Sequence, residues 1–118
     1  MSVSEGFLTF VLEQIESLPR VSSRRMFGGV GIYSDDRFFA VIDDDTLFFK
    51  VDDTTRARYT KRRMPPFHPM PDKPPMTGYY QVPPAILEDR EALTELARES
   101  VGVATRASAK PRARKRSK

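Results

Sequence analysis

Apolar residues recur at helical spacing near both ends of the chain. The first stripe predicts a helix from Ser4 to Leu18, opened by a capping box of Ser2 with Glu5 and stopped at Pro19. The second predicts a helix over Glu88–Ala104, entered through the proline pair 83–84. The stripe residues are Phe7, Leu8, Val11, Leu12, Ile15 and Leu18 in the first helix, and Leu93, Leu96, Ala97, Val101 and Ala104 in the second.

Between these helices the pattern changes to short apolar runs. Three runs, Arg25–Tyr33, Phe38–Ile42 and Leu47–Val51, are separated by the Asp-rich turns 34–37 and 43–46. In the third run Leu47, Phe49 and Val51 alternate with Phe48 and Lys50, which is the period of a strand with two different faces. Short turns between strands predict an antiparallel meander.

The next segment is rich in proline. Asp52–Thr55 carries helix-capping residues and predicts a helix over Thr54–Arg62. Residues 65–84 hold eight of the ten prolines, so the strands predicted at Phe67-His68 and Thr77–Val82 must be short or lie at an edge. The predicted class is α+β, with a single antiparallel sheet of a three-strand meander plus two short strands, packed by the N- and C-terminal helices.

Charge divides the chain into two parts. Of 20 Lys and Arg residues, seven lie in residues 106–118, which leaves 13 against 16 acidic residues in residues 1–105. We therefore predict an α+β domain over 1–105 and a basic, disordered tail over 106–118. Two interpretations of the tail stay open: it contacts nucleic acid, or it only keeps the chain in solution. The tail cations are Arg106, Lys110, Arg112, Arg114, Lys115, Arg116 and Lys118.

Composition excludes several classes of chemistry. The chain has no cysteine, which excludes disulfides, thiol catalysis and thiolate metal sites. No apolar run approaches the roughly 20 residues of a membrane span, and the N-terminus lacks the basic start of a signal peptide. We expect a cytoplasmic protein that does not contact membranes.

The remaining motifs do not complete a catalytic or cofactor site. Gly29-Val30-Gly31 precedes a turn and not a helix, so it is interpreted as strand glycines that permit close packing, and not as a phosphate loop. The Asp turns lack the ligand order of a calcium loop, and His68 has no evident nucleophile or acid beside it. The sequence predicts no catalytic residue, no cofactor and no metal.

Aromatic and basic residues raise two further hypotheses. Phe27, Tyr33, Phe38, Phe48, Tyr79 and Tyr80 could form a stacking platform for RNA, but RRMFGGVGIY does not fit the order of such a domain, so most are assigned to core packing. The cluster Lys61-Arg62-Arg63 is interpreted as favourable charge at a helix C-terminus.

Several short segments of the sequence resemble the TfoX N-terminal domain family. They are Arg25-Met26-Phe27-Gly28-Gly29 with Gly31 and Tyr33, then Phe39-Ala40, Leu47, Lys50-Val51-Asp52, Thr55-Arg56 and Gly78-Tyr79-Tyr80-Gln81-Val82-Pro83. The resemblance spans residues 7–105. The family is named for a regulator of natural competence and transcription, in which this domain precedes a second one. It implies an α+β domain without known catalytic residues.

Two functions from different classes follow. The first is a non-enzymatic regulatory or interaction domain, linked to transcription, whose partners are a second copy of the chain, another protein, or nucleic acid contacted by the tail. The alternative is a small enzyme or ligand-binding protein with a pocket between the sheet and the helices. The lack of a nucleophile–base pair or metal set favours the first.

Overall fold

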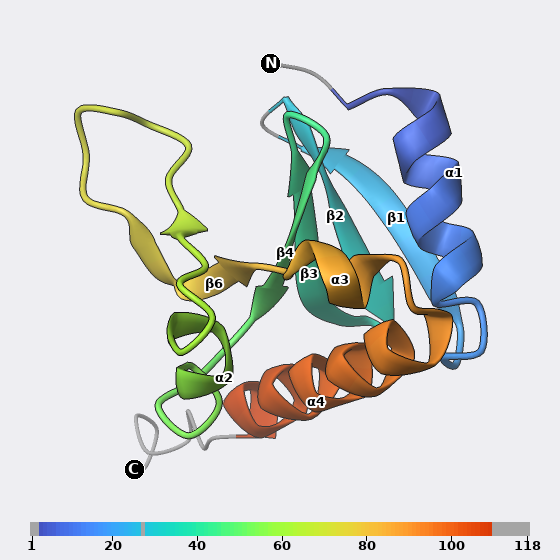
Figure 1. The fold of residues 1–118 in the computed structure, drawn as a ribbon. Coiled ribbons are helices and arrows are strands. Elements are labelled where there is room, and N and C mark those ends of the chain that lie inside the picture. Colours follow the sequence, from blue (N-terminus) through green and yellow to red (C-terminus); the bar gives the residue numbers. More distant parts are fainter. Residues whose placement is uncertain (1–2, 27, 110–118) are drawn as a thin grey trace, which may run out of the picture.

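The chain folds around one antiparallel sheet with the strand order β1-β2-β3-β4-β6-β5 (Figure 1). The computed structural model describes residues 3–26 and 28–109. The strands are β1 (Val21–Met26), β2 (Gly29–Ser34), β3 (Arg37–Asp43), β4 (Thr46–Lys50), β5 (Pro66–Phe67) and β6 (Met76–Gln81). The helices are α1 (Glu5–Gln14), α2 (Ala57–Thr60), α3 (Pro84–Leu87) and α4 (Arg90–Ala109). The predicted α+β class and its single antiparallel sheet are confirmed.

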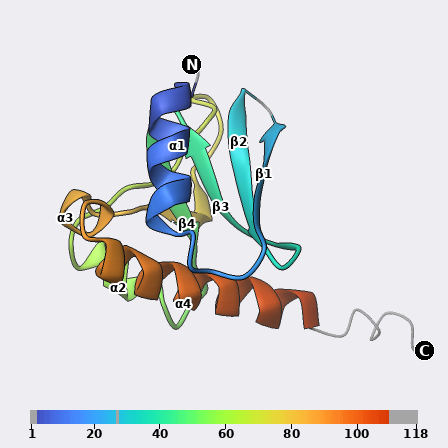
Figure 2. The same cartoon turned by 90° about the vertical axis from the view of Figure 1, so that its right-hand side faces the viewer.

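One face of the sheet, here called the covered face, packs against α1 and α4 (Figures 1 and 2). The predicted inner positions of both helices meet the sheet in one core. Its fully buried members are Val11, Ile15, Ile32, Phe39, Ala40, Ile42, Phe49, Leu93 and Ala97. The opposite side of the sheet, here called the open face, is bordered by the β5–β6 connection, and no helix of residues 3–26 and 28–109 packs on it (Figure 1).

Two tight turns hold the centre of the sheet in register. Asp35 and Asp36 join β2 to β3, and Asp44 and Asp45 join β3 to β4, all with φ between 52° and 68°. A left-handed pair in a two-residue loop is the hairpin turn whose twist matches that of the strands, and Asp tolerates this conformation. Both predicted turns are confirmed.

The predicted strand Arg25–Tyr33 is wrong in its bounds, because two strands occupy this region. β1 begins earlier, at Val21, and the chain then turns back at Gly28 (φ 81°). β1 is an edge strand whose residues 22–25 are exposed, so its polar composition concealed it. The sheet therefore contains one more strand than predicted.

β3 contains a bulge near its start. Ile32 pairs with Ala40, but the next residue, Tyr33, pairs with Phe38. Phe39 is the extra residue, and it joins Ala40 in the core of the covered face while Phe38 packs on the open face. A bulge of this kind changes which face each neighbouring side chain occupies.

The helices also differ from their predicted limits. Ser4 caps α1, since its Oγ accepts a hydrogen bond from the Phe7 N–H at 3.2 Å, whereas the predicted cap, Ser2, lies outside the described residues. α1 ends at Gln14, earlier than predicted, and α2 forms a single turn. α4 continues to Ala109, because Arg106 pairs with Asp52 and no proline occurs before Pro111.

Candidate binding site on the open face of the sheet

An aromatic cluster covers the open face. The strand period places Val41, Phe48 and Tyr79 on this side, and each is at most 9% exposed. Phe38 and Phe67 pack against them, with ring centroids of Phe48 and Phe67 4.8 Å apart. The sheet therefore has a second, smaller core with no helix above it.

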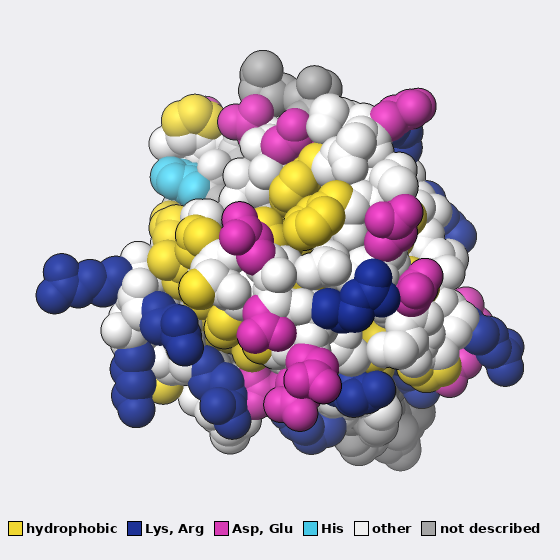
Figure 3. All heavy atoms as spheres, turned by 45° about the vertical axis from the view of Figure 1, so that its right-hand side comes forward, with side chains coloured by type: hydrophobic (Ala, Val, Ile, Leu, Met, Phe, Trp, Pro, Cys, Tyr) yellow, Lys and Arg dark blue, Asp and Glu magenta, His cyan; other side chains and the backbone are white. Residues whose placement is uncertain are grey.

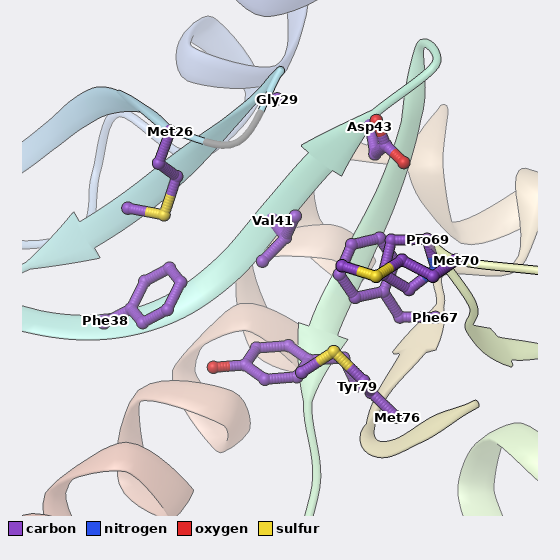
Figure 4. A pocket seen from close by; sticks show the side chains of 10 residues that line it. All are labelled: Met26, Gly29, Phe38, Val41, Asp43, Phe67, Pro69, Met70, Met76 and Tyr79. Atoms are coloured by element: carbon purple, nitrogen blue, oxygen red, sulfur yellow. The ribbon is translucent and has the colours of Figure 1, made fainter. Parts of the chain in front are cut away.

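A pocket of about 400 Å³ opens on this cluster (Figure 4). Strands β1, β2, β3, β5 and β6 contribute lining residues, and the β5–β6 connection forms one wall. Its lining residues are Met26, Gly29, Phe38, Val41, Asp43, Phe67, Pro69, Met70, Met76 and Tyr79. Met70 in this connection and Met76 at the start of β6 are 53% and 46% exposed, so they give the pocket an apolar rim.

Two glycines of β2 permit close packing in and beside the pocket. A Cβ on Gly31 would lie 2.7 Å from Met26 Cε and 2.8 Å from Phe38 Cε1, so glycine lets these side chains close over the strand. A Cβ on Gly29 would lie 2.5 Å from the Ile42 carbonyl oxygen. Both residues therefore serve close packing, as predicted, and the strand leads into a turn and not into a helix.

Positive and negative side chains occupy different places on the open face. The Arg24 guanidinium lies 5.5 Å from the centroid of the Tyr33 ring, and the Lys50 ammonium lies 5.0 Å from that of Tyr79. Asp43 is the one charged side chain among the residues that line the pocket. Burial, with a smaller contribution from Tyr33, raises the pKa of the Tyr79 hydroxyl, so this residue is a neutral hydrogen-bonding group.

The predicted motif 25–29 divides between pocket and surface. Met26 and Gly29 line the pocket, Gly28 makes the turn, and Arg25 is exposed beside them. Phe27 lies outside the described residues. Sequence reasoning did not find Asp43, Pro69, Met70 or Met76 as site residues. Met70 and Met76 have no periodic pattern around them, and Asp43 was interpreted only as a turn residue.

His68 stabilises the wall of the pocket. Its Nε2 lies 2.7 Å from the Lys73 carbonyl oxygen, which accepts the hydrogen bond and closes the β5–β6 connection. Within residues 3–26 and 28–109, no group of three or more His, Asp or Glu side chains is placed to hold a metal ion. The candidate site is therefore an apolar pocket with a single carboxylate, that of Asp43, among its lining residues.

Of the tail cations, only Arg106 belongs to the described residues. Its Nη2 lies 2.9 Å from Asp52 Oδ2, and this hydrogen bond, followed by that of Thr54, holds the pKa of Asp52 well below its usual range. The predicted contacts Lys110, Arg112, Arg114, Lys115, Arg116 and Lys118 lie outside the described residues.

The middle of α4 lies beside α2, and the end of α4 contacts Asp52, which precedes α2. Besides the Arg106–Asp52 pair, Arg58 of α2 contacts Glu99 of α4 at 2.7 Å. Lys61, Arg62 and Arg63 follow α2 directly and are all exposed. Basic side chains gather at the lower left of Figure 3, whereas acidic and basic side chains are interspersed over most of the remaining view. Lys61 and Arg62 line a shallow hollow together with Leu96, so this basic surface lies beside the first half of α4.

The described residues form an α+β domain with its two long helices on one side of the sheet. The chain belongs to the TfoX N-terminal domain family, which matches residues 13–104 of its 118 residues. Membership supports a regulatory domain related to competence. No curated protein matches the chain. Among the described residues, no helix is both long and apolar enough to cross a membrane.

Proposed function

We propose that this protein is a non-enzymatic regulatory or interaction domain, linked to transcription, which binds its partner through the open face. The observation that supports this best is the aromatic cluster with its exposed methionine wall. Exposed methionines beside an apolar pocket offer a partner apolar area to cover. Family membership supports the regulatory part of the proposal.

The tail is the proposed nucleic-acid contact. Six cations, Lys110, Arg112, Arg114, Lys115, Arg116 and Lys118, follow α4, and no acidic residue occurs among them. Counterion release from phosphates gives such contacts a steep dependence on salt and no sequence preference. The folded part alone is net acidic, so the tail should dominate the affinity.

A truncation after Ala109 tests the nucleic-acid proposal and keeps the Arg106–Asp52 pair intact. If all six cations contact phosphates, the logarithm of the affinity for duplex DNA should fall against the logarithm of the salt concentration with a slope of about −5. The truncated chain should bind DNA very weakly at the same salt. Equal binding by both forms would place the contact on the folded domain instead and refute the role of the tail.

Self-association is a further part of this proposal. β1 is an edge strand whose outer N–H and C=O groups are available for pairing, and unprotected edges favour association. Arg24 and Arg25 on this edge oppose a second identical edge, so we expect only a weak or moderate homodimer. Sedimentation that shows monomer alone at high micromolar concentration would exclude it.

The second candidate function is a ligand-binding protein, and the pocket on the open face favours it. The sequence-based alternative placed such a pocket between the sheet and the helices. On that side Ile15, Phe39 and Phe49 are fully buried and fill the space. The candidate pocket instead uses the opposite face, where its volume lies within the range of small-molecule sites.

A further inference from the structure

The pocket on the open face is built for a flat apolar group. Its floor and walls come from Phe38, Phe67 and Tyr79, together with three methionines, Met26, Met70 and Met76. Methionine side chains adapt their shape and make favourable contacts with aromatic rings. A ring inserted between them would cover apolar area on the floor and on the exposed wall at once.

The charges around the pocket favour a ligand with a positive charge over one with a negative charge. Asp43 is half-buried at the end of β3 and is followed by the exposed Asp44 and Asp45. The cations of this face, Arg24 and Lys50, do not line the pocket, and each already lies over a tyrosine ring. A positive group on the ligand would therefore meet a carboxylate, while a negative group would be repelled.

We propose that this pocket binds a small arylalkyl cation, an aromatic ring joined by a short chain to an ammonium group. The ring lies between Phe38, Tyr79 and the methionines, and the ammonium group donates to the Asp43 carboxylate. The inference rests on the ligand-binding candidate above and is independent of the basic tail, so loss of DNA binding on truncation would leave it standing.

Methionine methyl groups provide the readout. The full chain labelled with ¹³C at its methionine methyls is titrated with 2-phenylethylamine and, separately, with 3-phenylpropionate, which has a similar shape and the opposite charge. The amine should shift the signals of Met26, Met70 and Met76 in a saturable way. Met64, which packs against the core of the covered face, should not move and serves as the internal control.

The charge of the ligand gives a quantitative criterion. Attraction of the amine and repulsion of the carboxylate by a half-buried Asp43 should separate their affinities by about tenfold. Asp43→Asn should remove this preference while both ligands still shift the three methyls. Asp44→Asn, a neighbouring exposed carboxylate, is the matched control and should keep most of it.

Three outcomes would overturn the inference. The first is that neither probe shifts the three pocket methyls at millimolar concentration. The second is that 3-phenylpropionate binds as tightly as the amine, or that Asp43→Asn keeps the preference. The third is that the same methyl signals change with protein concentration alone, because the open face would then be covered by a second copy of the chain.

Discussion

The two faces of the sheet are built from the same strands but differ in what packs on them: helices cover one face, and a pocket opens on the other. Phe48 and Phe49 are neighbours in β4, yet Phe49 lies in the core under α1 and α4 and Phe48 lies in the cluster beneath the pocket. Two helices close the apolar area of the covered face, whereas exposed methionines, whose side chains adapt their shape, border the pocket on the open face. The free energy of unfolding should therefore depend mainly on the covered face, and ligand binding mainly on the open face.

The largest expected effect compares these two phenylalanines. Phe49→Ala should lower the free energy of unfolding by about 3–5 kcal/mol, because the cavity lies within a closed core. Phe48→Ala should cost less, about 2 kcal/mol, because its cavity borders the pocket and the side chains there can move into it. Urea denaturation followed by circular dichroism measures both. Equal losses would contradict the distinction between the two faces.

A second comparison uses the glycines of β2. Gly29→Ala brings a Cβ against the backbone carbonyl of Ile42, so the strands must separate, and we expect a loss of about 1–3 kcal/mol. Gly31→Ala meets only the side chains of Met26 and Phe38, which can rotate away, and should cost about 1 kcal/mol or less.

The two glycine variants should also differ in binding. Gly31→Ala should change the affinity for the amine probe, since it displaces two side chains that line the pocket. Thermal unfolding and the methyl titration are measured on the same samples. If Gly29→Ala proved the more stable of the two, the backbone contact at Ile42 would not limit the packing of β2 on β3.

The smallest effect concerns the pair that joins the end of α4 to the residues before α2. The folded-state pKa of Asp52 is depressed, so its contribution is present above the ordinary pKa of an Asp, about 3.9, and is lost as pH falls through the folded value. Both side chains are partly exposed, so Asp52→Asn should cost only about 0.2–1 kcal/mol at pH 7.

Below pH 4 the wild-type chain and the Asp52→Asn variant should converge in stability. Urea denaturation at a series of pH values measures the difference between them. A difference that stayed constant from pH 7 to pH 2 would show that Asp52 acts through packing and not through its charge.

The sequence was sufficient for the parts of the fold that depend on periodicity. The helical stripes of α1 and α4 and the alternation at Leu47–Val51 each predicted the face that is buried. It was insufficient where polar residues form a strand, since residues 22–25 of β1 lie at an edge and need no apolar side chains. It also could not predict the end of α4, which depends on a distant ion pair with Asp52.

The pocket was harder to predict than the fold. Its lining comes from five strands and a proline-rich connection, so no single segment carries its pattern. Met26 and Gly29 stand out in the sequence because they belong to the motif 25–29. The aromatic residues are visible in the sequence too, but nothing in it indicates that they share one site. The pairing of β6 with β4 brings Tyr79 to Phe48 and Val41, and its pairing with β5 places Met76 opposite Phe67.

The bulge in β3 has a consequence for how domains of this family could diverge. Residues 38–42 are apolar throughout, so hydrophobicity does not specify which way each side chain faces, and the extra residue at Phe39 decides it. Gaining or losing one residue there would exchange a ring of the core for a ring of the binding site. We therefore expect length variation in this hairpin, more than substitution, to be the shortest evolutionary route to a new specificity.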